Sequence, residues 1–140
     1  MEKFESINRL FIFLGGFTAS ALFGDFDYLI KGILGLMAFD YLTGFIASAI
    51  TGNLSSTKGF KGLLKKFVII MVICSGHIAD LMLQTQGNYV RDAFIYAYAA
   101  LELISIAENA GRAGLPVPSF MKRVIAIFHE KEDLKKEKGA

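Results

Sequence analysis

Four ionisable side chains lie inside long apolar stretches of the sequence, and these are the residues whose types could do chemistry. They are Asp40, His77, Asp80 and Glu102. At the centre of a membrane helix an aspartate costs about 2.5 to 3.5 kcal/mol, so such groups gain by hiding against protein or water. They could seal contacts between helices or line a water-filled path, and their types and positions agree with both interpretations. A proton relay would use the same groups, but no coupled-ion motif accompanies them.

The same residues make a poor metal site. His77 and Asp80 are spaced to share one helix face, and Cys74 precedes His77 by three residues. The chain has one cysteine and two histidines, of which the second, His129, lies in the carboxyl-terminal tail. This set lacks metal-ligand spacing, and the single cysteine excludes an internal disulfide. No catalytic triad, dinucleotide turn or phosphate-binding loop is present. We therefore expect no enzyme, no metal, no cofactor and no nucleic-acid partner.

The elements that hold the four groups are predicted to be membrane-spanning helices. Hydrophobic residues make up 54% of the 140 residues, and the mean hydropathy is +0.47. The apolar stretches lack the alternation of half-buried strands, and helices satisfy their own backbone groups in lipid. A helical span needs about 20 residues, which the second and third stretches provide and the first and fourth barely reach. Spans are predicted near residues 10–24, 28–51, 67–84 and 90–108.

The first stretch could alternatively be a signal peptide, because Lys3 and Arg9 precede its apolar core. Acidic Glu2 and Glu5 in the leader, and the further apolar segments downstream, argue against cleavage. We therefore interpret it as a span.

Basic residues predict the orientation, because cytoplasmic loops collect lysine and arginine. The joint after the second stretch carries four lysines and no acid, whereas the other two joints have little positive charge. The tail is also basic. Four crossings with both termini in the cytoplasm satisfy all of these preferences. The lysines of the cytoplasmic joint are Lys58, Lys61, Lys65 and Lys66.

Small residues recur at four-residue spacing, which in membranes lets helix backbones approach closely. This pattern predicts tight helix packing, either within one chain or between copies. The candidate packing residues are Gly15, Gly16, Ser20, Gly44 and Ser48.

The chain is predicted to consist of a transmembrane helical domain, residues 1–117, and a basic cytoplasmic tail, residues 118–140. In the tail, Phe120, Val124 and Phe128 repeat at helical spacing between basic side chains. This predicts an amphipathic helix on the inner leaflet, or one packed on a neighbouring subunit. The fold class is thus an all-α integral membrane protein with about four short spans and an interfacial helix.

The segments FDYLTG, SSTKGFKGLLKK, HIAD and ENAGRAGLPVP occur in this order within residues 37–136. Together they resemble the phage holin family that includes the clostridial toxin-secretion holins. The amino-terminal span matches less closely, and members are often described with three spans. The resemblance implies a multi-pass protein of the bacterial cytoplasmic (inner) membrane. It would self-associate and permeabilise that membrane, releasing a wall hydrolase in a phage or a large toxin in a toxin locus.

The partners that follow from this resemblance are further copies of the chain, anionic lipid headgroups, and the released hydrolase or toxin as cargo. Three other functions share the same features. A small ion channel or transporter subunit would also carry intramembrane acids. A holin antagonist would share nearly the whole sequence, and a membrane adaptor would bind a partner through the tail.

Overall fold

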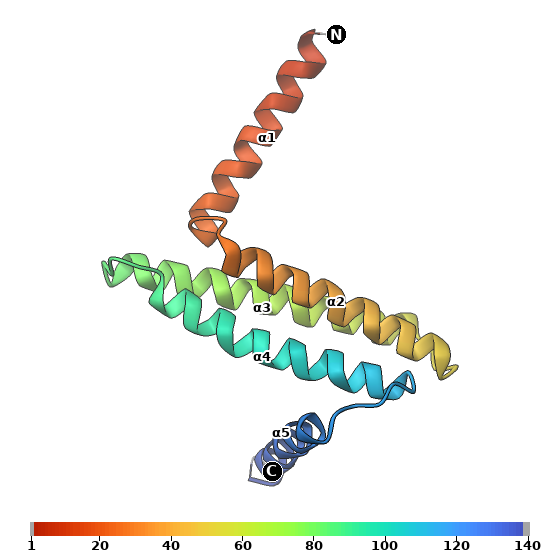
Figure 1. Cartoon of the computed structure of the whole chain (residues 1–140). Helices are drawn as coiled ribbons and strands as arrows, with labels where there is room; N and C mark the ends of the chain where they lie inside the picture. Colours follow the sequence, from red (N-terminus) through yellow and green to blue (C-terminus); the bar gives the residue numbers. More distant parts are fainter. Residues whose placement is uncertain (1, 139–140) are drawn as a thin grey trace. The chain divides into compact units, whose positions relative to one another are not determined.

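The computed structural model describes residues 2–138, with side chains described for residues 4–131. This part of the chain forms five α-helices and no strand (Figure 1), so the predicted all-α class is confirmed. The helices are α1 (Glu2–Phe23), α2 (Tyr28–Ile50), α3 (Ser56–Met82), α4 (Tyr89–Arg112) and α5 (Ser119–Lys138).

Three of these helices are long and apolar enough to cross a membrane. They are α1 over Phe4–Phe23, α2 over Tyr28–Ile50 and α3 over Ser56–Met82. Helix α4 has 24 residues but carries five charged side chains, and it is not among the three. The chain is therefore a helical membrane protein with three such helices among its described residues, and a fourth crossing stays a prediction.

The lysine-rich joint is mostly helical, which differs from the prediction of a loop. Helix α2 ends where Gly52 adopts a φ of +68°, a left-handed conformation that glycine accepts without strain. Ser55 then caps the next helix, since its hydroxyl accepts the Lys58 N–H at 3.4 Å. The turn is thus confined to residues 51–55, and all four lysines lie on α3. Similarly, α1 begins well before the predicted span near 10–24.

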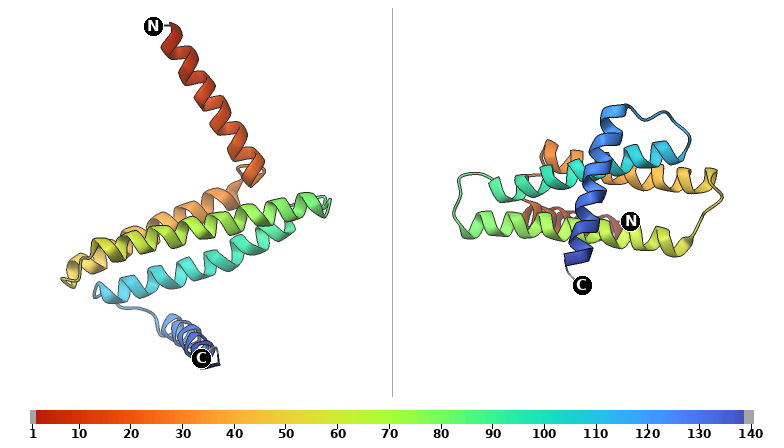
Figure 2. Two further views of the ribbon diagram at one scale, coloured as in Figure 1. Left: turned by 180° about the vertical axis from the view of Figure 1, so that it is seen from behind. Right: turned by 90° about the horizontal axis from the view of Figure 1, so that it is seen from below.

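The chain forms two compact units, and each of them contains pieces of α2, α3 and α4. Unit 1 comprises residues 1–34 and 66–98, and unit 2 comprises residues 35–65 and 99–140. Within each unit the pieces of the three helices lie side by side (Figures 1 and 2). This division does not follow the predicted boundary at residue 117, which stays a prediction.

Each unit has a small apolar core, and most large apolar side chains are exposed. Ile30, Ile33, Ile73 and Ile95 are buried in unit 1, and Met37, Ala47 and Ala107 are buried in unit 2. None of the span residues of α1 is buried, compared with 17% of those of α2 and of α3. An apolar surface of this extent is suited to lipid or to a partner helix.

Candidate functional site

Unit 1 contains a buried polar cluster where the link between α1 and α2 meets the link between α3 and α4. We call it the Arg91 cluster, and its members are Asp27, His77, Asp80, Asn88 and Arg91. The sequence suggested two of them, His77 and Asp80, as polar groups at lipid depth. In the structure, Asp80 accepts the first N–H groups of α4, and His77 is hydrogen-bonded to Asn88 in the link before α4.

Arg91 is the centre of this cluster and is only 1% exposed. Its Nη1 donates to the Phe23 carbonyl at 2.8 Å, and its Nη2 pairs with Asp27 at 2.5 Å. Its Nε donates to Asp92 at 2.9 Å. Phe23 is the last residue of α1, and the carbonyl end of a helix carries partial negative charge. One arginine on α4 therefore holds the end of α1 and two carboxylates.

Asp27 uses its two carboxylate oxygens for different purposes. Its Oδ1 accepts the N–H groups of Leu29 and Ile30, both at 3.0 Å, and so caps α2. Its Oδ2 pairs with Arg91. Partial burial alone would raise the pKa of Asp27, but the hydrogen bonds from Ile30 and Arg91 outweigh it and hold the pKa below its ordinary value.

Asp80 caps α4 from a neighbouring helix. Its side chain is on α3 and is 2% exposed, and its two oxygens accept the N–H groups of Val90 and Arg91, each at 3.0 Å. The Thr85 hydroxyl lies 3.2 Å from the same carboxylate. The first N–H groups of a helix have no intrahelical acceptor, and an acid there also complements the helix dipole. Asp80 therefore satisfies backbone groups that would otherwise be costly to bury.

His77 packs between the two links. Its Nδ1 forms a 3.0 Å hydrogen bond with the Asn88 side-chain oxygen. Its ring also lies against Gly24, where an added Cβ would sit 2.7 Å from the ring. Gly24 has a φ of +71°, so both its conformation and its surroundings require glycine. His77 is thus a packing and hydrogen-bonding residue.

Helices α3 and α4 approach closely at Gly76. A Cβ at this position would lie 2.7 Å from the Phe94 ring, 2.9 Å from the Arg91 Cα and 3.0 Å from the Arg91 backbone nitrogen. Small residues permit this kind of backbone approach. Gly76 does not belong to the pattern of small residues at four-residue spacing, because the positions four residues away are Val72 and Asp80.

Unit 2 contains a second polar group, the Asn109 cluster, between α2 and α4. Its members are Asp40, Thr43, Ser48, Asn109 and Arg112. Asn109 donates to the Asp40 carboxylate at 3.0 Å, and Arg112 donates to the Asn109 side-chain oxygen at 3.1 Å. Arg112 also donates to the Ser48 hydroxyl at 3.3 Å. The aspartate that interrupts the second apolar stretch therefore faces an amide of its own chain.

Gly44 and Ser48, two of the predicted packing residues, adjoin this cluster. An added Cβ at Gly44 would lie 3.3 Å from the Asn109 amide nitrogen, so the glycine makes room for that side chain. The third predicted acid, Glu102, is 4% exposed on α4. The structure thus buries Asp80 and Glu102 within one chain and leaves Asp40 half-buried.

The remaining predicted residues lie on exposed parts of the helices. Nothing lies within 4 Å of a Cβ added at Gly15 or Gly16 of α1, and Ser20 is exposed. On α3, Lys66 is half-buried and the other three predicted lysines are exposed. Two of the four predicted ionisable groups, His77 and Asp80, belong to unit 1, and the other two, Asp40 and Glu102, belong to unit 2.

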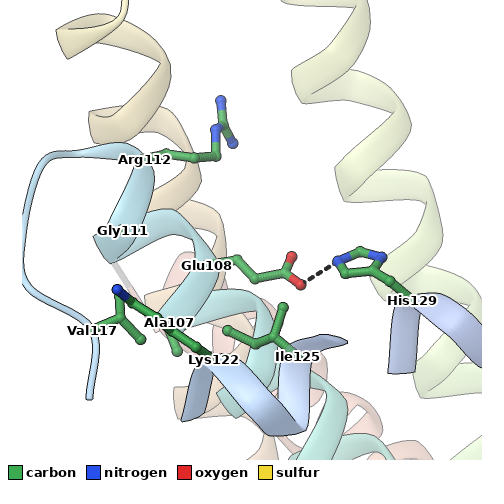
Figure 3. A pocket seen from close by; sticks show the side chains of 8 residues that line it. All are labelled: Ala107, Glu108, Gly111, Arg112, Val117, Lys122, Ile125 and His129. Carbon is green, nitrogen blue, oxygen red and sulfur yellow. Dashed lines mark hydrogen bonds and ion pairs between the residues drawn. The ribbon is translucent and has the colours of Figure 1, made fainter. Parts of the chain in front are cut away.

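Unit 2 also has an open groove between the last turns of α4 and the first half of α5 (Figure 3). Glu108 and His129 point toward each other across it, with the Glu108 Oε1 and His129 Nε2 2.6 Å apart. The lining residues are Ala107, Glu108, Gly111, Arg112, Val117, Lys122, Ile125 and His129. The sequence did not suggest this groove.

The two clusters are organised to hold helices together. Among the described residues, every buried side-chain nitrogen or oxygen has a hydrogen-bond partner. Within the same residues, no three His, Cys, Asp or Glu side chains are grouped so that they could hold a metal ion. The geometry therefore favours sealed helix contacts over reactive groups in these clusters.

Comparisons with known proteins agree with the resemblance seen in the sequence. The pattern that defines the bacteriophage holin family matches residues 17–130. An uncharacterized protein of Listeria innocua is 42% identical over 134 residues, which covers 96% of this chain and 95% of that protein. An uncharacterized protein of Listeria monocytogenes is 44% identical over 117 residues, covering 84% and 83%.

A more distant relative has a functional description. A protein of Bacillus phage phi105, described as a probable holin, is 27% identical over 117 residues, which covers 84% of this chain and 85% of that protein. No solved structure matches the chain. Because the family pattern covers most of the sequence, including both polar clusters, the chain belongs to the bacteriophage holin family.

Proposed function

We propose that the chain acts as a holin whose copies assemble in the bacterial cytoplasmic membrane and open lesions there. A wall hydrolase or a large toxin would leave the cell through these lesions. Family membership and the similarity to a probable holin support this function. The structural observation that carries it is α1, a helix able to cross a membrane with none of its span residues buried.

The small residues of α1 give this helix a face for association. Lipid tails are as apolar as leucine, so membrane helices associate through close packing and hydrogen bonds. Gly15 and Ala19, and likewise Gly16 and Ser20, are four residues apart and share a side of α1. No atom lies within 4 Å of a Cβ at either glycine. In our proposal the α1 helix of a second copy packs there.

The intramembrane acids have a smaller part in assembly than their sequence positions suggested. Asp80 and Glu102 are 2% and 4% exposed within the single chain, so the need to remove them from lipid does not drive association. Asp40 is half-buried and already bonded to Asn109. We therefore assign the driving force to α1, and we assign the acids to the internal stability of each copy.

We also propose that α4 is a fourth crossing. A helix of 24 residues rises about 36 Å, which exceeds the hydrocarbon core of about 30 Å. Its buried arginine and glutamate are sheltered by protein, which lowers the cost of charged groups at this depth. Both termini and the lysines of α3 would then lie in the cytoplasm. Reagent labelling of Lys61→Cys in a Cys74→Ala background tests this topology, and modification from outside only would contradict it.

The assembly proposal is tested by enlarging the small residues of α1. Gly15→Leu and Gly16→Leu should reduce cross-linked oligomers and delay the abrupt loss of membrane potential. Lysis should follow that loss only when a wall hydrolase is co-expressed. Ala21→Leu is the matched control, because Ala21 is exposed on the opposite side of the same helix.

The outcomes separate holin function from the other candidates. Unchanged oligomers and unchanged timing in both glycine variants would contradict assembly through α1. Selective flux of one small solute, without passage of protein, would instead indicate a channel or transporter subunit. Delayed lysis by a second holin would indicate an antagonist, and an intact membrane under all conditions would indicate an adaptor.

A further inference from the structure

The groove between α4 and α5 is open to solvent and is large enough to hold a small ligand. Its volume is about 420 Å³, within the range of small-molecule sites. Its floor is apolar, since Ala107, Val117 and Ile125 line it together with Gly111. An added Cβ at Gly111 would lie 3.1 Å from the Val117 side chain, so the loop after α4 packs tightly against that helix.

Basic groups outnumber acidic groups around this floor. Arg112 and Lys122 are the positively charged lining residues, and Glu108 is the acid among them. Glu108 already has a partner, because its Oε1 lies 2.6 Å from the His129 Nε2. Lys122 is exposed, so its ammonium group can meet a ligand without displacing a buried contact. The charge of the groove therefore complements an anion that also has an apolar part.

The side of α5 that faces away from the groove indicates where the groove lies relative to the membrane. Phe120, Val124, Ile127 and Phe128 are 40% to 59% exposed. At 100° per residue they fall on the side of α5 opposite the residues that line the groove. An amphipathic helix with such a face lies at the boundary between headgroups and acyl chains. If that face is in lipid, the groove is level with the headgroups.

We propose that this groove binds one anionic phospholipid of the inner leaflet. The phosphate lies at the basic rim beside Lys122, and the glycerol and first acyl carbons lie on the apolar floor. Basic pockets on the cytoplasmic side of membrane helices have this ligand chemistry. The proposal rests on the membrane placement given under the proposed function, and it adds a specific lipid site to it.

The test measures lipid retention by the full chain purified in a mild, uncharged detergent. The protein is incubated with equal amounts of phosphatidylglycerol and phosphatidylcholine, and bound lipid is counted by native mass spectrometry. The wild type should retain phosphatidylglycerol in preference to phosphatidylcholine. Lys122→Gln should reduce retained phosphatidylglycerol about fivefold, as expected for one basic group near an anionic lipid.

Arg123→Gln is the matched control, because Arg123 is the next residue of α5, is exposed and does not line the groove. It should retain phosphatidylglycerol as the wild type does. Equal loss in both variants, or no preference in the wild type, would overturn the site. Helical content by circular dichroism verifies that both variants fold. A chain that retains lipid but causes no lysis would contradict the proposed function alone, and lysis without selective retention would contradict the site alone.

Discussion

Gly76→Ala should destabilise the protein, because the added methyl group has no space between α3 and α4. The Phe94 ring can rotate away, but the Arg91 backbone cannot easily move from its positions 2.9 and 3.0 Å from the new Cβ. Its N–H is bonded to Asp80, and its side chain is bonded to Phe23 and Asp27. Overpacking costs about 1 to 3 kcal/mol. Because two of the three close contacts are to backbone atoms, the cost at Gly76 lies near the upper end of this range.

A helix gains about 0.5 to 1 kcal/mol when alanine replaces an interior glycine. Subtracting this gain leaves a net loss of about 2 kcal/mol for Gly76→Ala. The measurement is reversible unfolding in mixed micelles of a mild detergent and dodecyl sulfate. Loss of helical signal reports the transition.

Gly62→Ala is the matched control, because it makes the same chemical change in the interior of the same helix. Nothing lies within 4 Å of a Cβ at Gly62, so the variant should keep the gain of about 0.5 to 1 kcal/mol. The two substitutions should therefore shift stability in opposite directions. If Gly76→Ala is as stable as Gly62→Ala, the close approach of α3 and α4 is not as described, and the reasoning fails.

Two further predictions concern the acids of the Arg91 cluster. Asp80→Asn keeps one oxygen for the N–H groups of Val90 and Arg91, so one hydrogen bond to a charged acceptor is lost, at about 1.5 to 3 kcal/mol. The same unfolding titration measures this loss, and unchanged hydrogen exchange at both amides would contradict it. Because the folded-state pKa of Asp27 lies below its ordinary value, the stability that it contributes is present above about pH 4 and is lost as the pH falls through the folded-state pKa. Asp27→Asn should therefore lose less stability on acidification than the wild type, and equal losses would refute the assignment.

The helices could be predicted from the sequence because their apolar stretches are long and lack alternation. Membrane helices satisfy their own backbone groups, so hydropathy alone locates them. Their ends were less predictable, since lysines within SSTKGFKGLLKK suggested a loop although nothing there stops a helix. The lysines lie on the first turns of α3, where long side chains can reach the interface.

The central role of Arg91 could have been inferred from charges that the sequence already showed. With four crossings, the joint that contains Asp25 and Asp27 and the start of the span near residues 90–108, which contains Arg91, lie at the same face of the membrane. Opposite charges on neighbouring joints of one membrane face can pair, and the structure pairs Arg91 with Asp27. Arg91 also pairs with its sequence neighbour Asp92 at 2.8 Å, and this is the partner that the sequence alone suggests.

The groove between α4 and α5 could not be predicted, because it depends on the direction in which the link between these helices leads the chain. Residues 113–118 contain one glycine and two prolines, which signal a break in the helix but do not determine the direction of the chain after it. Glu108 and His129 are in contact although they are 21 residues apart in the sequence. A glutamate and a histidine at this separation do not indicate a contact. The amphipathic pattern of α5 was visible, but the side that faces α4 was not.

The exposed surface of α1 has a consequence for synthesis. This helix leaves the ribosome before α2 to α5, and its own chain buries none of its span residues. In water its phenylalanines and leucines would attract other unfolded chains before the later helices are made. The nascent protein therefore depends on prompt delivery to the insertion machinery, and slow delivery would reduce its yield before any question of lysis timing arises.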